Sequence, residues 1–176
     1  MVRIERTLIT EEEIATRIAD MGAQISADYE GKDLMVVGVL KGAFMVMADL
    51  ARAITIPVEF DFMAVSSYGA ATQTSGVVRI LKDLDTEIEG RHVLIIEDII
   101  DSGLTLSYLI RSLKVRRPAS LTIATLLRKT GIQRVPLDVE YVGFEIGEEF
   151  VVGYGLDFDG KLRNLPYIGI LDESSI

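Results

Sequence analysis

Apolar positions along the chain follow two different spacings, and each spacing predicts a different kind of element. Over residues 10–29 they recur every three or four positions, and Thr10 and Glu13 have the spacing of a capping box, so this stretch predicts a helix. Residues 34–40 form an unbroken apolar run, which predicts a strand buried on both faces. Residues 43–54 return to the helical spacing and predict a second helix.

The remaining apolar stretches are mostly short and predict strands. The predicted strands span residues 57–66, 77–84, 92–100, 121–127, 139–146, 150–153 and 167–171. A third helix is predicted over Leu104–Lys114, and Phe44 is expected on the buried side of the second helix. Residues 67–76 lack apolar periodicity, and we expect a mobile surface loop there. Strands that alternate with helices predict a parallel sheet with helices on both faces.

Length and composition restrict the class of protein. The 176 residues suit a single α/β domain over 1–176, with a small extra piece contributed by the termini. The 49% of hydrophobic and 26% of charged residues are ordinary for a globular chain. Cysteine is absent, which excludes disulfides, cysteine zinc sites and thiol nucleophiles. The polar start does not resemble a signal peptide and the apolar runs are too short to span a bilayer, so we expect a cytoplasmic protein without membrane contact.

The net charge narrows the possible partners. It is −9, from 18 basic and 27 acidic residues, whereas nucleic-acid binders usually carry the opposite sign. We therefore expect no nucleic-acid partner. A small, highly phosphorylated substrate can still bind, because a cation, helix-start amides and a few basic side chains reverse the sign locally.

Candidate chemistry gathers where predicted strands end, which is where open parallel sheets bind their ligands. The strand 92–100 carries Glu97 and Asp98 near its end, and residues 101–105 then open a helix. Ser102 and Thr105 offer hydroxyls there, Gly103 permits a close backbone approach, and the helix start presents free amides. This pattern predicts a phosphate site.

A simple helix cap is the alternative interpretation of the same segment. Asp101 or Ser102 could cap the first turn without any ligand. Capping does not explain Glu97 and Asp98, which would repel a phosphate unless a cation or hydroxyl groups lie between them. Mg²⁺ binds carboxylate and phosphate oxygens together, and ribose hydroxyls can pair with carboxylates in the same way.

Competing motifs are incomplete. The chain has no P-loop, no nucleophile elbow and no zinc-protease motif, and we interpret Gly153-Tyr154-Gly155 as a chance fragment of a dinucleotide motif. His92 is the single histidine, and we expect it at a strand entrance, away from the site. Histidine-based catalysis is therefore nearly excluded.

Residues 93–105, VLIIEDIIDSGLT, resemble the phosphoribosyl-pyrophosphate signature of the purine phosphoribosyltransferases. The chain is more closely similar to the bacterial hypoxanthine-guanine members, and the match covers nearly all of it. The further matching segments are LKG (40–42), VSSYG (65–69), LLRK (126–129), YVGFEI (141–146), FVVGYGLD (150–157) and RNLP (163–166).

The resemblance implies a fold and a reaction. The fold would be the type I phosphoribosyltransferase fold, a central, mostly parallel sheet flanked by helices with a small hood formed by terminal segments. The reaction would join N9 of hypoxanthine or guanine, and possibly xanthine, to the ribose of phosphoribosyl pyrophosphate. IMP or GMP and pyrophosphate would result, with Mg²⁺ as the cofactor and a homodimer or homotetramer as the assembly.

The resemblance also implies roles for residues of the sugar and phosphate side. Asp101 would be the general acid or base at purine N7. Glu97 and Asp98 would meet the ribose hydroxyls directly or through Mg²⁺, and Asp157 would be a second metal ligand. The 5′-phosphate would be held by the loop Ser102, Gly103, Leu104 and Thr105.

Further implied contacts are with pyrophosphate, the lid and the base. Pyrophosphate would be contacted by Lys41, Gly42 and Arg163, and the family has a non-proline cis peptide at the first two. A lid that excludes water would include Ser67 and Tyr68. Lys129 would donate to O6 of the base, because an ammonium group has only donors. Phe150 would stack on the ring of the base, and Val151 would form a hydrogen bond to it through the backbone.

The chain also departs from its relatives, and other functions stay open. Gly147 stands where proline is common, and residues 130–134, which we expect beside the base pocket, leave xanthine use open. A sister transferase for xanthine or adenine is one alternative. A regulator that binds RNA is another, opposed by the net charge of −9. A purely structural α/β domain would not explain Glu97, Asp98 and Asp101.

Overall fold

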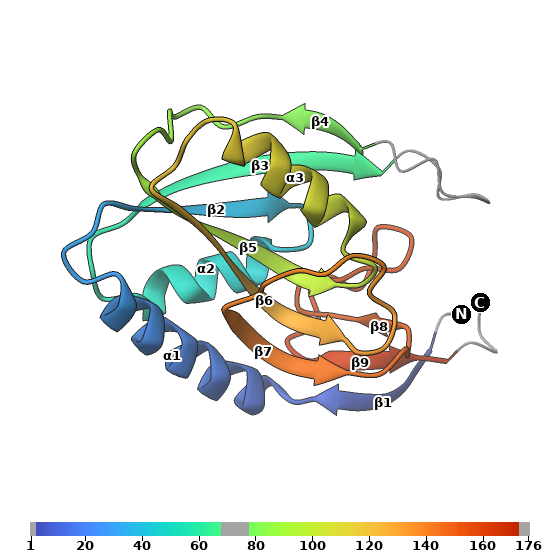
Figure 1. Ribbon diagram of the computed structural model, residues 1–176. Helices are drawn as coiled ribbons and strands as arrows, with labels where there is room; N and C mark the ends of the chain where they lie inside the picture. Colours follow the sequence, from blue (N-terminus) through green and yellow to red (C-terminus); the bar gives the residue numbers. More distant parts are fainter. Residues whose placement is uncertain (1–2, 68–77, 173–176) are drawn as a thin grey trace.

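The computed structural model describes residues 3–67 and 78–172, and Figure 1 shows how their elements are arranged. In chain order these elements are β1 (Ile4–Ile9), α1 (Glu11–Asp28), β2 (Leu34–Leu40), α2 (Phe44–Ala53), β3 (Glu59–Ser67), β4 (Val78–Lys82), β5 (His92–Ile100), α3 (Leu104–Lys114), β6 (Ser120–Lys129), β7 (Tyr141–Ile146), β8 (Val151–Val152) and β9 (Ile168–Leu171). Among the described residues, no helix combines the length and the apolarity that a membrane span requires.

A six-stranded sheet forms the centre of the fold, in the order β4-β3-β2-β5-β6-β7. Every neighbouring pair is parallel except β3 and β4, which are antiparallel. In the middle of the sheet, Gly38 of β2 pairs with Phe62 of β3 and Ile96 of β5. This confirms the predicted mostly parallel sheet, and it brings the carboxyl ends of β2, β5 and β6 to one edge.

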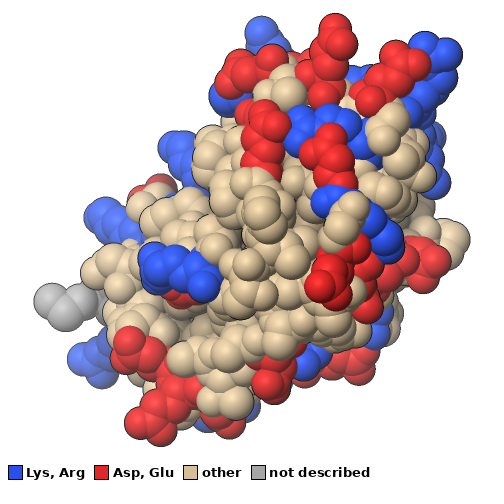
Figure 2. Space-filling view, turned by 90° about the vertical axis from the view of Figure 1, so that its left-hand side faces the viewer, with Lys and Arg blue, Asp and Glu red and all other residues tan. Residues whose placement is uncertain are grey.

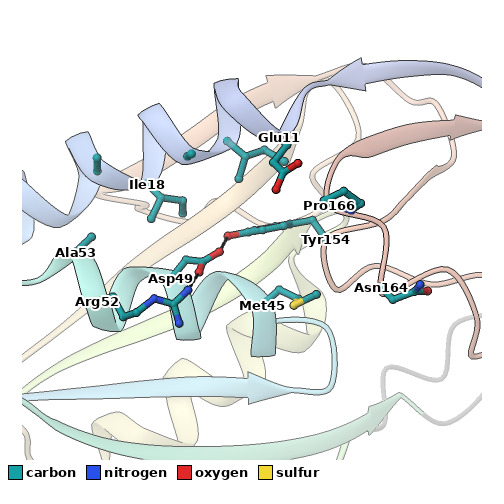
Figure 3. A pocket seen from close by; sticks show the side chains of 12 residues that line it. Glu11, Ile18, Met45, Asp49, Arg52, Ala53, Tyr154, Asn164 and Pro166 are labelled. Carbon is teal, nitrogen blue, oxygen red and sulfur yellow. Dashed lines mark hydrogen bonds and ion pairs between the residues drawn. The ribbon is translucent and has the colours of Figure 1, made fainter.

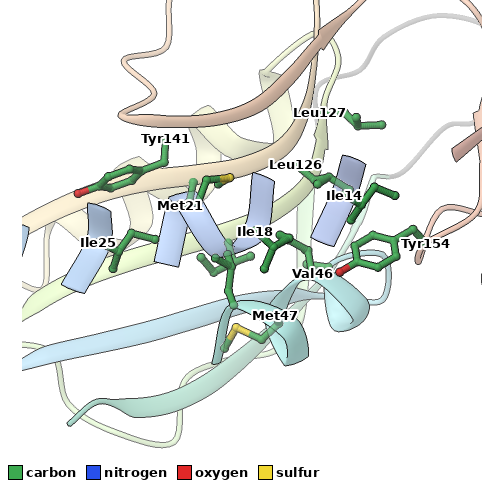
Figure 4. Close-up of a cluster of buried hydrophobic side chains, with 14 of the residues drawn as sticks. Ile14, Ile18, Met21, Ile25, Val46, Met47, Leu126, Leu127, Tyr141 and Tyr154 are labelled. Carbon is green, nitrogen blue, oxygen red and sulfur yellow. The ribbon is translucent and has the colours of Figure 1, made fainter. Parts of the chain in front are cut away.

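Helices cover both faces of the sheet, as predicted. Leu94 and Ile96 of β5 belong to the buried cluster with α1 and α2, part of which Figure 4 shows, whereas Val93 and Ile95 belong to the cluster with α3. Because successive side chains of a strand point to opposite faces, a strand buried on both faces needs an apolar residue at each position. This explains the unbroken apolar run at the start of β5.

Helix boundaries follow the sequence signals closely, with one error in orientation. The capping box of α1 is present: Glu13 N–H donates to Thr10 Oγ1 at 3.2 Å, and Thr10 N–H donates to Glu13 Oε2 at 2.8 Å. The expectation that Phe44 packs in the core is wrong, since this residue is 40% exposed. The buried stripe of α2 runs through Val46, Met47 and Leu50, and the roughly 100° step per residue turns Phe44 away from it.

The terminal segments form a second, antiparallel sheet in the order β1-β9-β8, which confirms the predicted hood. Strand β1 was not among the predicted strands. Of its six residues only Ile9 is buried, so the segment lacks the apolar alternation of a core strand. Strand β9 supplies the apolar side of this pairing, with all four of its residues buried.

The opposite end of the sheet, where the central strands begin, has an ion-paired surface. Figure 2 looks onto this end and shows acidic and basic side chains side by side. Arg91 of this end lies 2.9 Å from Asp33 and 2.8 Å from Glu59, and Arg116 lies 2.7 Å from Asp83. The charges on this end therefore largely neutralise one another locally.

Candidate functional site

Two adjacent carboxylates lie near the carboxyl end of β5, of which Glu97 is buried and Asp98 is half-buried. Burial raises the pKa of Glu97 well above its usual range, and the negative charge of Asp98 adds to the effect. Burial also raises the pKa of Asp98, although the Ile99 N–H at 2.8 Å and the charge of Arg163 partly oppose the shift. An additional cation or hydroxyl donors at this position would stabilise the charged forms of both groups.

The loop between β5 and α3 forms a cradle. Gly103 adopts a left-handed φ of 80° and precedes the first turn of α3, which has no side-chain cap. The capping alternative holds only in part, because Ser102 Oγ accepts a hydrogen bond from Leu104 N–H, and this bond is long at 3.4 Å. A cavity of about 110 Å³ opens here, lined by Glu97, Ile99, Ile100, Asp101, Ser102, Gly103, Thr105 and Leu106. The free amides of the helix start suit this cavity to a phosphate.

A second loop supports this cradle from behind. Arg134 N–H donates to the carbonyl of Ser102 at 2.9 Å, and a Cβ on Gly103 would come within 2.7 Å of Leu137 Cδ1. Residues 130–134 were expected beside the base pocket. In the structure Gln133 donates to the backbone carbonyl of Lys129, while Arg134 at the end of the segment contacts Ser102, so the segment lies between Lys129 and the loop after β5.

The loop after β2 approaches the carboxylates closely. Its Leu40–Lys41 peptide is cis, and Lys41 is exposed. A Cβ on Gly42 would lie 1.6 Å from Asp98 Oδ2, so only glycine fits this position without a shift. From the other side, a Cβ on Gly155 would lie 2.1 Å from the Gly42 carbonyl oxygen. Gly42 is therefore held between Asp98 and the loop that follows β8.

Asp157 and Arg163 lie on that loop and form an ion pair of 2.7 Å. Arg163 also donates from Nη1 to the Gly155 carbonyl at 2.6 Å, and Asp157 Oδ2 accepts the Gly160 N–H at 2.7 Å. The charges of Asp157 and Arg163 act on the pKa of Asp98 in opposite directions, which places both groups within electrostatic reach of β5. The structure therefore brings together Gly42, Asp98, Asp157 and Arg163.

Lys129 at the end of β6 and Asp101 directly after β5 face each other. Lys129 Nζ lies 3.9 Å from Asp101 Oδ2 and donates to the Glu148 carbonyl at 3.4 Å. The Asp101 side chain is 61% exposed and that of Lys129 is 11% exposed. Phe150 is also exposed and contacts Phe158 edge to face, with 5.9 Å between the ring centroids. Val151 is fixed in β8 by its pairing with Ile170.

Three further residues of the sequence analysis either lie away from the carboxylates of β5 or lie outside the described residues. Ser67 is the last residue of β3, and Tyr68, with the rest of the expected lid, lies outside the described residues. His92 begins β5 at the far end of the sheet, where Nδ1 lies 2.7 Å from Ser120 Oγ. This confirms that the single histidine is remote from the site.

Sequence reasoning missed the close approach of Gly155 to Gly42. Residues 150–157 were among the segments that resemble the family, but Gly153-Tyr154-Gly155 was otherwise interpreted only as a chance fragment of a dinucleotide motif. In the structure Gly155 contacts Gly42, although the two are more than a hundred residues apart in the chain. Two glycines that flank an aromatic residue close to Asp157 are a signal of close backbone approach, and this signal was present in the sequence.

Comparisons with known proteins assign the chain to a family. The family model described as "Phosphoribosyl transferase domain" matches residues 7–159. The chain belongs to this family. This confirms the resemblance seen at residues 93–105 and the type I fold that the resemblance implied.

Individual relatives of this phosphoribosyltransferase are similar over nearly its whole length. A hypoxanthine-guanine phosphoribosyltransferase of Mycobacterium avium is 55% identical over 175 residues, which cover 96% of this chain and 86% of the relative. Its counterpart in Bacillus subtilis is 52% identical, covering 96% and 93% of the two chains. A solved hypoxanthine phosphoribosyltransferase of Staphylococcus aureus superposes with a TM-score of 0.94 at 46% identity and covers 97% of this chain and 93% of its own.

Proposed function

We propose that this phosphoribosyltransferase is a Mg²⁺-dependent hypoxanthine-guanine phosphoribosyltransferase. The observation that carries the proposal is the pair Lys129 and Asp101, 3.9 Å apart beside the phosphate cradle. A 6-oxopurine with its proton on N7 presents an acceptor, O6, next to a donor, N7–H. The ammonium of Lys129 matches O6, and the carboxylate of Asp101 matches N7–H. Adenine instead presents a 6-amino group, which donates and would oppose the ammonium.

The chemical step forms one bond, breaks one bond and moves one proton. The lone pair on N9 of the base forms the bond to C1′ of the ribose, while the bond from C1′ to the pyrophosphate oxygen breaks. Asp101 accepts the proton of N7, so that the nucleotide leaves with a neutral imidazole ring. Phe150, exposed at the end of the hood, stacks on the base and holds N9 in line with C1′.

The phosphates and the sugar are held by separate groups. Backbone amides and hydroxyls of residues 102–105 bind the 5′-phosphate, and Glu97 and Asp98 pair with the ribose hydroxyls. Lys41, Gly42 and Arg163 contact the leaving pyrophosphate. The expected lid at Ser67 and Tyr68 would exclude water, which would otherwise hydrolyse the activated sugar.

The carboxylates of the site fit Mg²⁺ as part of a substrate complex. The described residues contain no cluster of three acidic, histidine or cysteine residues that could enclose an ion alone. Mg²⁺ commonly takes one or two carboxylates together with substrate phosphates and water. Glu97, Asp98 and Asp157 would hold it here, and burial of the first two without a full counter-charge favours a cation. When bound, Mg²⁺ neutralises the charge that develops on pyrophosphate.

The proposal also covers the reaction products, the cellular compartment and the oligomeric state. Guanine would give GMP and hypoxanthine IMP, in purine salvage in the cytoplasm. The family resemblance supports a homodimer or homotetramer, which sedimentation analysis of the purified protein would measure.

Initial rates with four bases test the proposed substrate class. Phosphoribosyl pyrophosphate and Mg²⁺ are combined with hypoxanthine, guanine, xanthine or adenine, and nucleotides are separated by chromatography. Hypoxanthine and guanine should react fastest. Lys129→Met should lower kcat/KM for hypoxanthine by about 10- to 100-fold, because a bond to a charged donor is lost, while Lys32→Met on the far side serves as the control. A preference of the unmodified protein for adenine would contradict the assignment of Lys129.

A further inference from the structure

A buried tyrosine connects the loop after β8 to helix α2. Tyr154 is only 6% exposed, and its hydroxyl donates to Asp49 Oδ2 on α2. Asp49 also accepts a hydrogen bond from Arg52, as the dashed lines in Figure 3 show. The pair lines a cavity of about 560 Å³ between α1, α2 and residues 154–166. Neither residue belongs to the site described above.

The backbone at Tyr154 has an unusual conformation that its surroundings hold in place. Its φ is +47°, in the left-handed region that residues other than glycine rarely adopt. Its N–H donates to the Leu165 carbonyl at 2.8 Å, and Gly153 and Gly155 on either side also have positive φ. Burial raises the pKa of Tyr154, and the bond to Asp49 adds to the shift, so the phenol remains a donor across the working pH range.

Tyr154 lies next to a close backbone contact of the site. Gly155 follows Tyr154 directly and lies against the Gly42 carbonyl, and Gly42 in turn lies against Asp98. The Gly155 carbonyl accepts the hydrogen bond from Arg163. On the other side, α2 begins two residues after Gly42. The bond from Tyr154 to Asp49 therefore fixes both partners of the Gly42–Gly155 contact relative to each other.

We propose that Tyr154 and Asp49 are positioning residues that hold the two pyrophosphate-contacting loops together before the substrate binds. The pair touches no substrate and acts through Gly42 and Arg163. If the loops are held in advance, less conformational entropy is lost on binding the pyrophosphate group. The inference rests on the proposed function, since it assigns the pair to one substrate of that reaction.

The proposal predicts an effect on one substrate only. Binding of phosphoribosyl pyrophosphate should weaken when the bond is lost, because its pyrophosphate contacts lie on these loops. Binding of the base should not change, because Lys129 and Asp101 lie on β6 and after β5, and β8 is held independently by its pairing with β9.

Tyr154→Phe is the test, and the chain provides a matched control. Tyr141 is 5% exposed and donates its hydroxyl to Asp28 on α1 at 2.7 Å, which is the same chemistry far from the site. Tyr141→Phe should cost similar stability in a urea titration. Only Tyr154→Phe should raise the KM for phosphoribosyl pyrophosphate, by about tenfold, with the KM for hypoxanthine within about twofold of the unmodified protein.

Changes at Asp49 give an independent measurement that does not alter the tyrosine. Asp49→Asn keeps an amide oxygen as acceptor and should retain a KM within about twofold, whereas Asp49→Leu removes the acceptor and should reproduce the effect of Tyr154→Phe. Loss of the exposed pair with Arg52 is common to both variants and contributes little.

Each outcome decides the proposal. An unchanged KM for phosphoribosyl pyrophosphate in Tyr154→Phe, an equal change for both substrates, or the same change in Tyr141→Phe would overturn it. If the unmodified protein transfers no phosphoribosyl group, the proposed function fails. The positioning role is then judged from the dissociation constant of Mg²⁺-phosphoribosyl pyrophosphate, measured by calorimetry on the same variants.

Discussion

Gly42→Ala is the sharpest perturbation of the candidate site, because it adds one methyl group where the structure has no room. The new Cβ would lie 1.6 Å from Asp98 Oδ2, and a tolerable contact needs at least 3.0 Å. Asp98 is half-buried and bonded to the Ile99 N–H, and Gly155 blocks movement of Gly42 in the opposite direction. We expect the overpacking to lower the free energy of unfolding by about 1–3 kcal/mol.

The effect on catalysis should exceed the effect on stability. A displacement of about 1 Å in a reacting geometry costs on the order of 100-fold in rate. The proposed function places Asp98 beside the sugar and Gly42 beside pyrophosphate, so kcat/KM for phosphoribosyl pyrophosphate should fall by about 100-fold or more. Urea titrations give the stability, and steady-state rates at a temperature where the variant is folded give kcat/KM.

Gly22→Ala is the control variant, because it adds a methyl group to another tightly packed position that lies away from the site. A Cβ on Gly22 would come within 2.5 Å of Ala53 Cβ, at the contact between α1 and α2. Its stability loss should be partly offset by the better helix propensity of alanine, about 1 kcal/mol, and its kcat/KM should stay close to normal. The reasoning is refuted if Gly42→Ala keeps a kcat/KM within about threefold of normal, or loses no more activity than Gly22→Ala.

Three further predictions follow from the same geometry. Asp101→Asn should slow turnover by about 100- to 10,000-fold while leaving the affinity for phosphoribosyl pyrophosphate mostly intact, and single-turnover rates with binding titrations would check both. Burial alone would raise the pKa of Asp61, but backbone N–H bonds and the charge of Lys82 outweigh it and hold that pKa below its usual value. Asp61 therefore stabilises the fold above the pKa of the unfolded chain and loses this effect as pH falls through the folded value. Asp61→Asn should cost about 2–3 kcal/mol at pH 7 and progressively less as the pH falls below about 4, measured by urea titration at each pH. Chelation of Mg²⁺ should reduce transfer to background, and an excess of Mg²⁺ should restore it; unchanged rates in chelator would contradict a metal-dependent reaction.

Elements with strong local signals could be predicted from the sequence with correct boundaries. The strand His92–Ile100 and the helix Leu104–Lys114 were predicted with the same ends that the structure shows. A strand buried on both faces leaves an unbroken apolar run, and residues such as Asp101 and Ser102 commonly precede the start of a helix. Both signals are local.

Features that depend on tertiary partners could not be predicted in the same way. Strand β1 is held by its pairing with β9, more than 150 residues later, and has little apolar pattern of its own. Phe44 carries a core-type side chain but lies beside the buried stripe of its helix. In both cases the sequence shows the residue type, and the packing decides where it lies.

The candidate site likewise has some features that could be predicted from the sequence and others that could not. The carboxylates at the end of β5 and the glycine of the phosphate loop were visible because one short segment contains them. The contact of Gly42 with Gly155 and the support of Ser102 by Arg134 join distant segments. No local pattern marks these contacts, because they arise only when the hood and the long loop fold onto the sheet.

The stoichiometry of the products tests the central claim most directly. The protein is incubated with hypoxanthine, phosphoribosyl pyrophosphate and Mg²⁺, and IMP and pyrophosphate are measured in the same samples over time. The account predicts equal amounts of both from the first time point. Pyrophosphate released together with ribose 5-phosphate and without IMP, or no consumption of either substrate, would contradict it.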